Sequence, residues 1–261
     1  MSRIASVFNN PAHKALIPYI TVGYPSVEAA LEVVPLLASS GSDIIELGIP
    51  FSDPLADGVT IQKASYHALQ NGITPRICLE IAEKLSDKVD IPLVFMTYFN
   101  LVFHYGIKEF CRACKGAGID GLIIPDLLPE EGLELEAVTK KQGLDLIYFL
   151  APTSTEERVR LIAERSRGFI YLVSLTGVTG ARERLPADLE TFVARVRRVA
   201  TQPLCVGFGI STPEQAQQVA SIADGVIVGS KLIQLMESAD NYLPEVGNFI
   251  SSLRQALDET T

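Results

Sequence analysis

Eight short runs of apolar residues, rich in Ile, Val and Leu, recur along the chain. They occupy residues 16–22, 43–49, 91–97, 119–124, 145–150, 169–174, 203–208 and 224–228. Because the runs are almost continuously hydrophobic, they are typical of strands that are covered on both faces, as in a parallel sheet.

Amphipathic segments with helix-start residues separate these runs. Ser26, Thr155 and Thr212 stand where a side-chain oxygen can accept from the free N–H groups of a first helical turn. Two helical stretches, 61–71 and 75–88, fill the widest gap. Eight strand–helix units predict a (β/α)8 TIM barrel. An open doubly wound sheet is the alternative, although its GxGxxG fingerprint is missing after the first strand.

The whole chain, residues 1–261, is predicted to form a single barrel domain with extra terminal helices. Its length suits one α/β barrel of about 250 residues, and no Pro-, Gly- or Ser-rich linker divides it. Residues 242–258 predict an extra helix packed on the barrel. Residues 2–13 predict a short helix that closes its bottom.

The charge balance excludes some partners. Lys and Arg number 22 and Asp and Glu number 31, which gives a net charge of −9 and argues against binding to nucleic acid or to an anionic membrane. The apolar runs are too short for a membrane span, and the first residues do not form a secretory signal, so we expect a cytoplasmic protein. Cys111 and Cys114 form a CxxC in a helix-like segment without a second ligand pair, so no metal site is expected.

Two carboxylates lie where a barrel places its active residues, one towards the C-terminal end of the second run and one in the loop after it. Glu46 lies among apolar residues, which raise a carboxyl pKa towards the value useful for proton transfer. A salt-bridged structural Glu is the alternative. Asp57 follows in a Pro- and Gly-rich loop, where turn formation is its alternative role. Together the two would divide proton transfer from stabilisation of a cationic intermediate.

Glycines follow the last three runs. Gly180, Gly209 and Gly229 stand at the ends of these runs, and Ser230 opens a helical segment. Backbone N–H groups at such glycines and at a helix N-terminus bind phosphate in barrels of this class. The pattern therefore predicts a phosphate site, although tight turns would explain each glycine alone.

Several segments together resemble one family. They are PYITVGYPS at 18–26, IELGIPFSDPLADGVTIQKAS at 45–65, FMTYFNLVFHYG at 95–106, YLVSLTGVTGAR at 171–182 and GVIVGS at 225–230. Over essentially its whole length the chain resembles the tryptophan synthase alpha subunit family. The resemblance implies retro-aldol cleavage of indole-3-glycerol phosphate to indole and glyceraldehyde 3-phosphate, without a cofactor or metal in this subunit. It also implies a beta subunit that uses pyridoxal phosphate to join indole to serine, in an alpha2-beta2 tetramer.

The resemblance assigns roles by matching position. Glu46 is implied as the general acid/base at indole C3 and at the glyceryl hydroxyl, and Asp57 as the group that holds the indole N–H. Tyr171 is implied as a neighbour that shapes the site around Glu46. The remaining implied positions are Tyr19, Tyr98, Leu101 and Leu122 around the indole, Gly180, Gly209, Gly229 and Ser230 at the phosphate, and Asp53, Pro54 and Asn100 at the partner contact.

Three other functions stay open at this point. They are a stand-alone indole-3-glycerol phosphate lyase, another phosphate-binding barrel enzyme of amino-acid biosynthesis, and a non-catalytic barrel that regulates a beta subunit. Loss of Glu46 or Asp57 would mark the last, and both are present.

Overall fold

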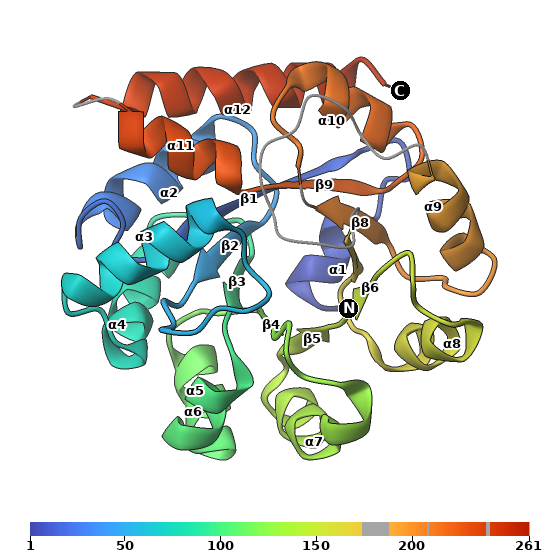
Figure 1. Cartoon of the computed structure of the whole chain (residues 1–261), viewed down its shortest axis with the longest axis horizontal. Helices are drawn as coiled ribbons and strands as arrows, with labels where there is room; N and C mark the ends of the chain where they lie inside the picture. Colours follow the sequence, from blue (N-terminus) through green and yellow to red (C-terminus); the bar gives the residue numbers. More distant parts are fainter. Residues whose placement is uncertain (174–187, 208, 239–240, 261) are drawn as a thin grey trace.

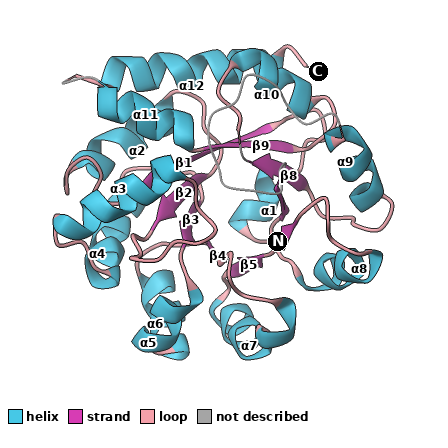
Figure 2. Cartoon of the chain, in the orientation of Figure 1, coloured by secondary structure: helices cyan, strands magenta, loops and turns pink. Residues whose placement is uncertain are grey.

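The strands form one ring surrounded by helices in the computed structural model, which describes residues 1–173, 188–207, 209–238 and 241–260 (Figure 1, Figure 2). In these residues the strands are β1 (Ala15–Thr21), β2 (Ile45–Gly48), β3 (Leu93–Met96), β4 (Gly121–Ile123), β5 (Asp145–Ile147), β6 (Phe149–Leu150), β7 (Ile170–Val173), β8 (Leu204–Gly207) and β9 (Gly225–Val228). Their hydrogen-bonded order is β5-β4-β3-β2-β1-β9-β8-β7-β6, with parallel pairings between neighbours.

The ring is nearly closed through one segment of the chain. Strands β5 and β6 stand at the two ends of the order, yet only Tyr148 separates them in sequence. They are two halves of the single run predicted at 145–150, one paired with β4 and the other with β7. The Tyr148 carbonyl also accepts from the Tyr171 N–H at 3.0 Å. The predicted barrel is confirmed, with its fifth strand divided, and the open doubly wound sheet is excluded.

Apart from α1, which precedes β1, the helices lie on the outside of the ring (Figure 1). In the described residues they are α1 (Arg3–Val7), α2 (Ala29–Ser39), α3 (Val59–Gln70), α4 (Pro75–Ser86), α5 (Phe99–Tyr105), α6 (Ile107–Gly116), the 3-10 helix η1 (Pro129–Glu131), α7 (Leu133–Gln142), α8 (Glu156–Arg165), α9 (Leu189–Arg197), α10 (Pro213–Ala220), α11 (Ser230–Ser238) and α12 (Leu243–Asp258). Thr155 and Thr212 cap α8 and α10 through their hydroxyl oxygens, as predicted. None of these helices has the length and apolarity needed to cross a bilayer.

Two apolar layers account for the continuous hydrophobicity of the strands. In β1, Leu16 and Ile20 pack in the layer between strands and helices, whereas Ile17 and Tyr19 pack in a second layer inside the barrel. Successive side chains of a strand point to opposite faces, so both faces must be apolar. The inner layer sets which strand residues can reach the open end of the barrel.

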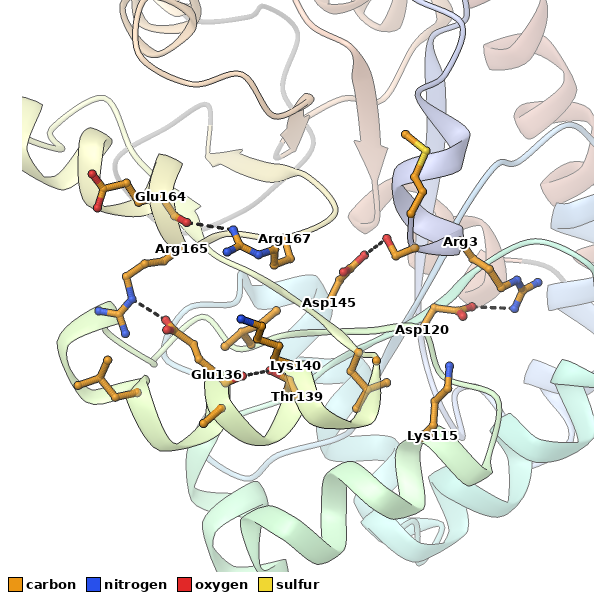
Figure 3. Close-up of a pocket in the computed structure, with 17 residues that line it drawn as sticks. Arg3, Lys115, Asp120, Glu136, Thr139, Lys140, Asp145, Glu164, Arg165 and Arg167 are labelled. Atoms are coloured by element: carbon orange, nitrogen blue, oxygen red, sulfur yellow. Dashed lines mark hydrogen bonds and ion pairs between the residues drawn. The ribbon is translucent and has the colours of Figure 1, made fainter.

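The N-terminal ends of the strands, together with α1, form an end that we call the floor. Ile4 of α1 is fully buried in the inner layer. Ser2 donates a hydrogen bond to Asp145, and Arg3 Nη1 donates to Asp120 Oδ2 at 2.8 Å (Figure 3). The predicted helix that closes the bottom of the barrel is therefore confirmed, over a shorter span than 2–13.

The last helix also fastens the floor. Helix α12 packs on α2, α10 and α11, as predicted for an extra helix at 242–258. Its Arg254 donates from Nη1 to the Lys14 carbonyl at 3.0 Å and to Asp43 Oδ2 at 3.1 Å. The opposite end of the barrel, at the C-terminal ends of the strands, is the mouth.

Candidate active site at the barrel mouth

A cavity opens at the mouth and gathers residues that are far apart in sequence. Its described lining consists of Tyr19, Glu46, Asp57, Ile61, Met96, Tyr171, Gly209, Ile210, Ile227, Gly229 and Ser230. Concave, mainly apolar sites with a few convergent polar groups are the usual form of a small-molecule site. The cavity brings together both predicted carboxylates, two of the predicted tyrosines and three of the predicted phosphate ligands.

Glu46 is buried without a partner. Parallel register places it between Tyr19 of β1 and Val94 of β3, and its side chain is 0% exposed. Neither carboxyl oxygen has a hydrogen-bond partner among the described residues. Burial, and then the charge of Asp57, raise the pKa of Glu46 to about 8. Glu46 is therefore a neutral acid near pH 7, and it makes no salt bridge in the described part of the chain.

Asp57 has one partner. It precedes α3, whose N-cap is Gly58, and the free N–H groups of that first turn favour a carboxylate. Its Oδ2 accepts from the Tyr98 hydroxyl at 3.0 Å, while Oδ1 is buried without a partner among the described residues. Burial raises the pKa of Asp57 to about 6, and the hydrogen bond from Tyr98 opposes that rise. Near pH 7 Asp57 is mainly ionised, and its charge state differs from that of Glu46.

Two tyrosines of the cavity lining place their hydroxyl groups against glycine residues, where a larger residue would clash. The Tyr19 hydroxyl lies 3.2 Å from Thr21 Oγ1, and a Cβ added to Gly48 would stand 2.1 Å from the same hydroxyl oxygen. A Cβ on Gly207 would stand 2.5 Å from the Tyr171 hydroxyl oxygen. Burial raises the pKa of both phenols above the ordinary value of 10, so both hydroxyls keep their protons.

Backbone groups line the cavity near the start of α11. Gly209 has a φ of 85°, in the region that favours glycine. Gly229 precedes Ser230, the first residue of α11, where backbone N–H groups have no helical partner and carry partial positive charge. These three residues could hold a phosphate by N–H and hydroxyl donation. The fourth predicted ligand, Gly180, lies outside the described residues.

Comparisons with known proteins identify the family of this chain. The family model described as tryptophan synthase alpha chain matches residues 6–258. The chain belongs to the tryptophan synthase alpha chain family. Like other members, it is a lyase that cleaves indole-3-glycerol phosphate and partners with a beta subunit. The pyridoxal phosphate of tryptophan synthase belongs to that beta chain.

Relatives and solved structures cover nearly the whole chain. A tryptophan synthase alpha chain of Dehalococcoides mccartyi is 59% identical over 99% of this chain and 100% of its own length. One from Geobacter sulfurreducens is 47% identical over 98% and 99%. The structure of the alpha subunit from Legionella pneumophila has a TM-score of 0.92 and 37% identity, covering 99% of each chain. That of Mycobacterium tuberculosis tryptophan synthase has a TM-score of 0.91 and 40% identity, covering 98% of each.

Three residues that the resemblance implies around the indole are not part of the described cavity lining. The Tyr98 hydroxyl contacts Asp57 Oδ2. Leu101 of α5 and Leu122 of β4 pack in the layer between strands and helices. Ile123 is the β4 residue that faces the barrel interior.

The residues implied at the contact with the beta subunit lie in two segments that follow β2 and β3. Asp53 and Asn100 are exposed, whereas Pro54 is buried. The same segments carry Leu55 and Phe103, which are 88% and 67% exposed. Leu55 stands two residues after Asp53, and Phe103 stands three residues after Asn100.

Sequence reasoning missed some residues of the site. Gly48, beside the Tyr19 ring, and the apolar lining residues Ile61, Met96, Ile210 and Ile227 were not predicted. Gly48 carried a sequence signal, because it follows Glu46 at the same face of β2. Cys111 and Cys114 of the CxxC motif are buried in α6. The described residues contain no cluster of His, Cys, Asp and Glu that could hold a metal ion.

Proposed function

We propose that Glu46 and Asp57 carry out the cleavage, with Glu46 as general acid and base and Asp57 as the group that binds the indole N–H. One observation supports this division most. Two buried carboxyl groups line one cavity, and only Asp57 has a hydrogen-bond partner among the described residues. Environments that push two pKa values apart are the usual basis of an acid and a charged stabiliser at one site.

The first step is protonation of the indole ring. Neutral Glu46 donates its proton to indole C3, and the ring becomes a cationic indolenine. Asp57, as a carboxylate, accepts a hydrogen bond from the ring N–H and lies beside the positive charge as it forms. In a cavity that excludes water such an interaction is stronger than in solvent.

The second step breaks the carbon–carbon bond. Glu46, now a carboxylate, takes the proton of the glyceryl hydroxyl on the carbon attached to C3. That carbon becomes the aldehyde of glyceraldehyde 3-phosphate, and the electron pair of the broken bond returns to the ring to give indole. Glu46 is left protonated, ready for the next substrate. Only protons move between enzyme and substrate, so we propose that this subunit needs no cofactor or metal for its step.

The phosphate end of the substrate is proposed to bind Gly209, Gly229 and Ser230. The family resemblance adds Gly180. Tyr19 and Tyr171 would enclose the middle of the substrate, because both line the cavity. A phosphate ester crosses a bilayer poorly since its charge is costly in hydrocarbon, so we propose a cytoplasmic location.

The beta subunit is proposed to contact Asp53, Pro54 and Asn100, in an alpha2-beta2 tetramer. The exposed Leu55 and Phe103 support this surface. Light scattering of an equimolar mixture of the two chains should give the mass of two copies of each. A complex with the mass of only one copy of each chain would contradict the tetramer. Full complex formation by the double variant Leu55→Asp, Phe103→Asp would contradict the proposed contact surface.

Glu46→Gln tests the proposed chemistry. Gln keeps the shape of the side chain but donates no proton, so indole release should fall by about 1,000-fold. Binding of a non-cleavable indole alkyl phosphate, measured by calorimetry, should change less than about threefold, since ΔΔG below about 0.7 kcal/mol corresponds to that ratio. Glu136→Gln, on outer helix α7, is the matched control and should keep its activity. An active Glu46→Gln enzyme would overturn the role of Glu46.

A further inference from the structure

The Tyr98 hydroxyl makes two hydrogen bonds with the loop that carries Asp57. It accepts from the Ala56 backbone N–H at 3.1 Å and lies 3.0 Å from Asp57 Oδ2. A backbone N–H only donates, so the phenol proton is left for the carboxylate. The direction of the Tyr98–Asp57 hydrogen bond is therefore fixed: Tyr98 donates and Asp57 accepts.

The position of Tyr98 is held by contacts that do not involve the cavity. It is the N-cap residue of α5, and the next N–H, of Phe99, donates to Asp126 Oδ1 at 2.9 Å. The N–H of Thr97 donates to the Ile123 carbonyl at 3.0 Å. The ring of Phe51 stacks on the Tyr98 ring at 4.9 Å between centroids. Backbone and ring are thus fixed before any substrate arrives.

Fixing one oxygen of a carboxylate orients the other. With Oδ2 held by Tyr98, rotation of the Asp57 carboxylate is restricted, and Oδ1 remains buried and without a partner among the described residues. We propose that Tyr98 is a positioning residue that holds the Asp57 carboxylate with Oδ1 free to receive the indole N–H. This inference rests on the proposed role of Asp57 and assigns Tyr98 a place behind the cavity wall instead of in it.

The same hydrogen bond separates the two carboxyl groups electrostatically. The titratable groups that interact with Asp57 are Glu46 on β2, Tyr19 on β1, Tyr171 on β7 and Tyr98 itself. Among them, Tyr98 is the one whose hydrogen bond lowers the pKa of Asp57 against the effect of burial. Without the hydroxyl, the pKa of Asp57 rises towards that of Glu46, and fewer molecules carry one neutral acid and one carboxylate.

Tyr98→Phe tests the proposal by removing one oxygen atom. At pH 7 kcat for indole-3-glycerol phosphate cleavage should fall by about tenfold, with KM within about threefold of wild type, because loss of one charge-assisted hydrogen bond has roughly that effect. The acid limb of the profile of kcat against pH should move up by about one pH unit. Carbon-13 NMR titration of the aspartate carboxyls should show the same rise in the pKa of Asp57 in the absence of turnover.

Tyr148→Phe is the matched control. Tyr148 is also buried and also donates to a carboxylate, at 2.7 Å to Glu136 Oε1, but on the outer helix α7. Its variant should keep the wild-type acid limb and kcat. A Tyr98→Phe enzyme with an unmoved acid limb would overturn the proposal even if kcat fell, since a purely structural loss would lower activity without changing the titration.

A double variant separates this proposal from the one on which it rests. In an Asp57→Asn background, Tyr98→Phe should change kcat less than about twofold, because coupled residues are strongly non-additive. The same tenfold loss in both backgrounds would show that Tyr98 acts independently of Asp57, and would overturn it. Full activity of Asp57→Asn alone would instead remove the role of Asp57, a failure visible without any change at Tyr98.

Discussion

The floor and the mouth of the barrel both bury carboxylates but treat them differently. At the floor, Asp120 accepts from Arg3 and from the Leu93 backbone N–H, and Asp145 accepts from Ser2. At the mouth, three of the four carboxyl oxygens of Glu46 and Asp57 have no partner among the described residues. A buried polar group without a hydrogen bond destabilises the fold by about 1–3 kcal/mol.

The difference distinguishes carboxylates that stabilise the barrel from carboxyl groups that are proposed to bind the substrate. Each floor carboxylate has a polar partner from another segment, whereas three carboxyl oxygens at the mouth have none among the described residues. Enzymes commonly accept such a loss of stability where activity requires it. The four changes that follow test this contrast, from the largest expected effect to the smallest.

Gly48→Ala should damage the mouth most. The added methyl group would stand 2.1 Å from the Tyr19 hydroxyl oxygen, so the ring must move beside Glu46. Small misplacements in an active site cost about 100-fold in rate, and kcat/KM should fall by that factor. Gly121→Ala at the floor, where the methyl would meet Ile4 Cδ1 at 2.7 Å, is the counterpart. It should lower Tm and leave the activity of the folded enzyme intact; an inactive but stable Gly121→Ala would break the contrast.

The pH dependence of cleavage should reflect the two mouth carboxyls as a pair. The pKa of Asp57 is about 6 and that of Glu46 about 8, and the proposed starting state has Asp57 ionised and Glu46 protonated. Activity should therefore be highest between these values, with kcat/KM falling about tenfold per pH unit on either side. Steady-state rates in overlapping buffers would measure this dependence of kcat/KM on pH. A profile that stays flat up to pH 10 would contradict Glu46 as the acid.

Arg3→Ala should weaken the floor alone. It removes the hydrogen bond to Asp120 at 2.8 Å and leaves that carboxylate with the Leu93 N–H. Because Arg3 is half exposed, water replaces part of the interaction, and Tm should fall by only about 2–4 °C, which corresponds to roughly 1 kcal/mol. Calorimetry gives the shift. Indole release at 25 °C should stay within twofold of wild type, and a larger loss would show that floor and mouth are coupled.

Glu46→Gln should make the protein more stable in alkaline solution. The pKa of Glu46 is about 8 in the folded state against an ordinary 4.5, so the unfolded chain loses its proton first as pH rises. Stability is therefore lost progressively between these two values, and Gln cannot contribute to that loss. The Tm of the variant should exceed that of wild type by a few degrees at pH 8 and match it near pH 4.5. The opposite trend would contradict an unpaired, buried Glu46.

The barrel and its two carboxylates were predictable because each depends on a local pattern. Continuous apolar runs reveal strands covered on both faces, and position at the end of the second run places Glu46 at the mouth. The division of the fifth strand was not predictable. Residues 145–150 form one apolar run, and the break at Tyr148 depends on which neighbour each half pairs with.

Side-chain direction explains the other differences. The resemblance implies Tyr98 beside the indole, and the structure shows its hydroxyl bonded to Asp57, with Tyr98 outside the described cavity lining. Leu122 faces the helices, because β4 turns Ile123 inward instead. The need for glycine at position 48 becomes visible only in the fold, where the Tyr19 ring packs against it. Each of these depends on two segments meeting, which a single stretch of sequence does not specify.

Closure of the ring has a consequence for how the chain is made. Strand β1 pairs with β9, and Arg254 of α12 bonds the Lys14 carbonyl, 240 residues earlier. A ribosome delivers these partners last, so a nascent chain halted before β9 presents β1 as an open sheet edge. Such edges invite pairing with other chains. The ring of strands is therefore complete only after β9, the last strand in the described residues, has been made.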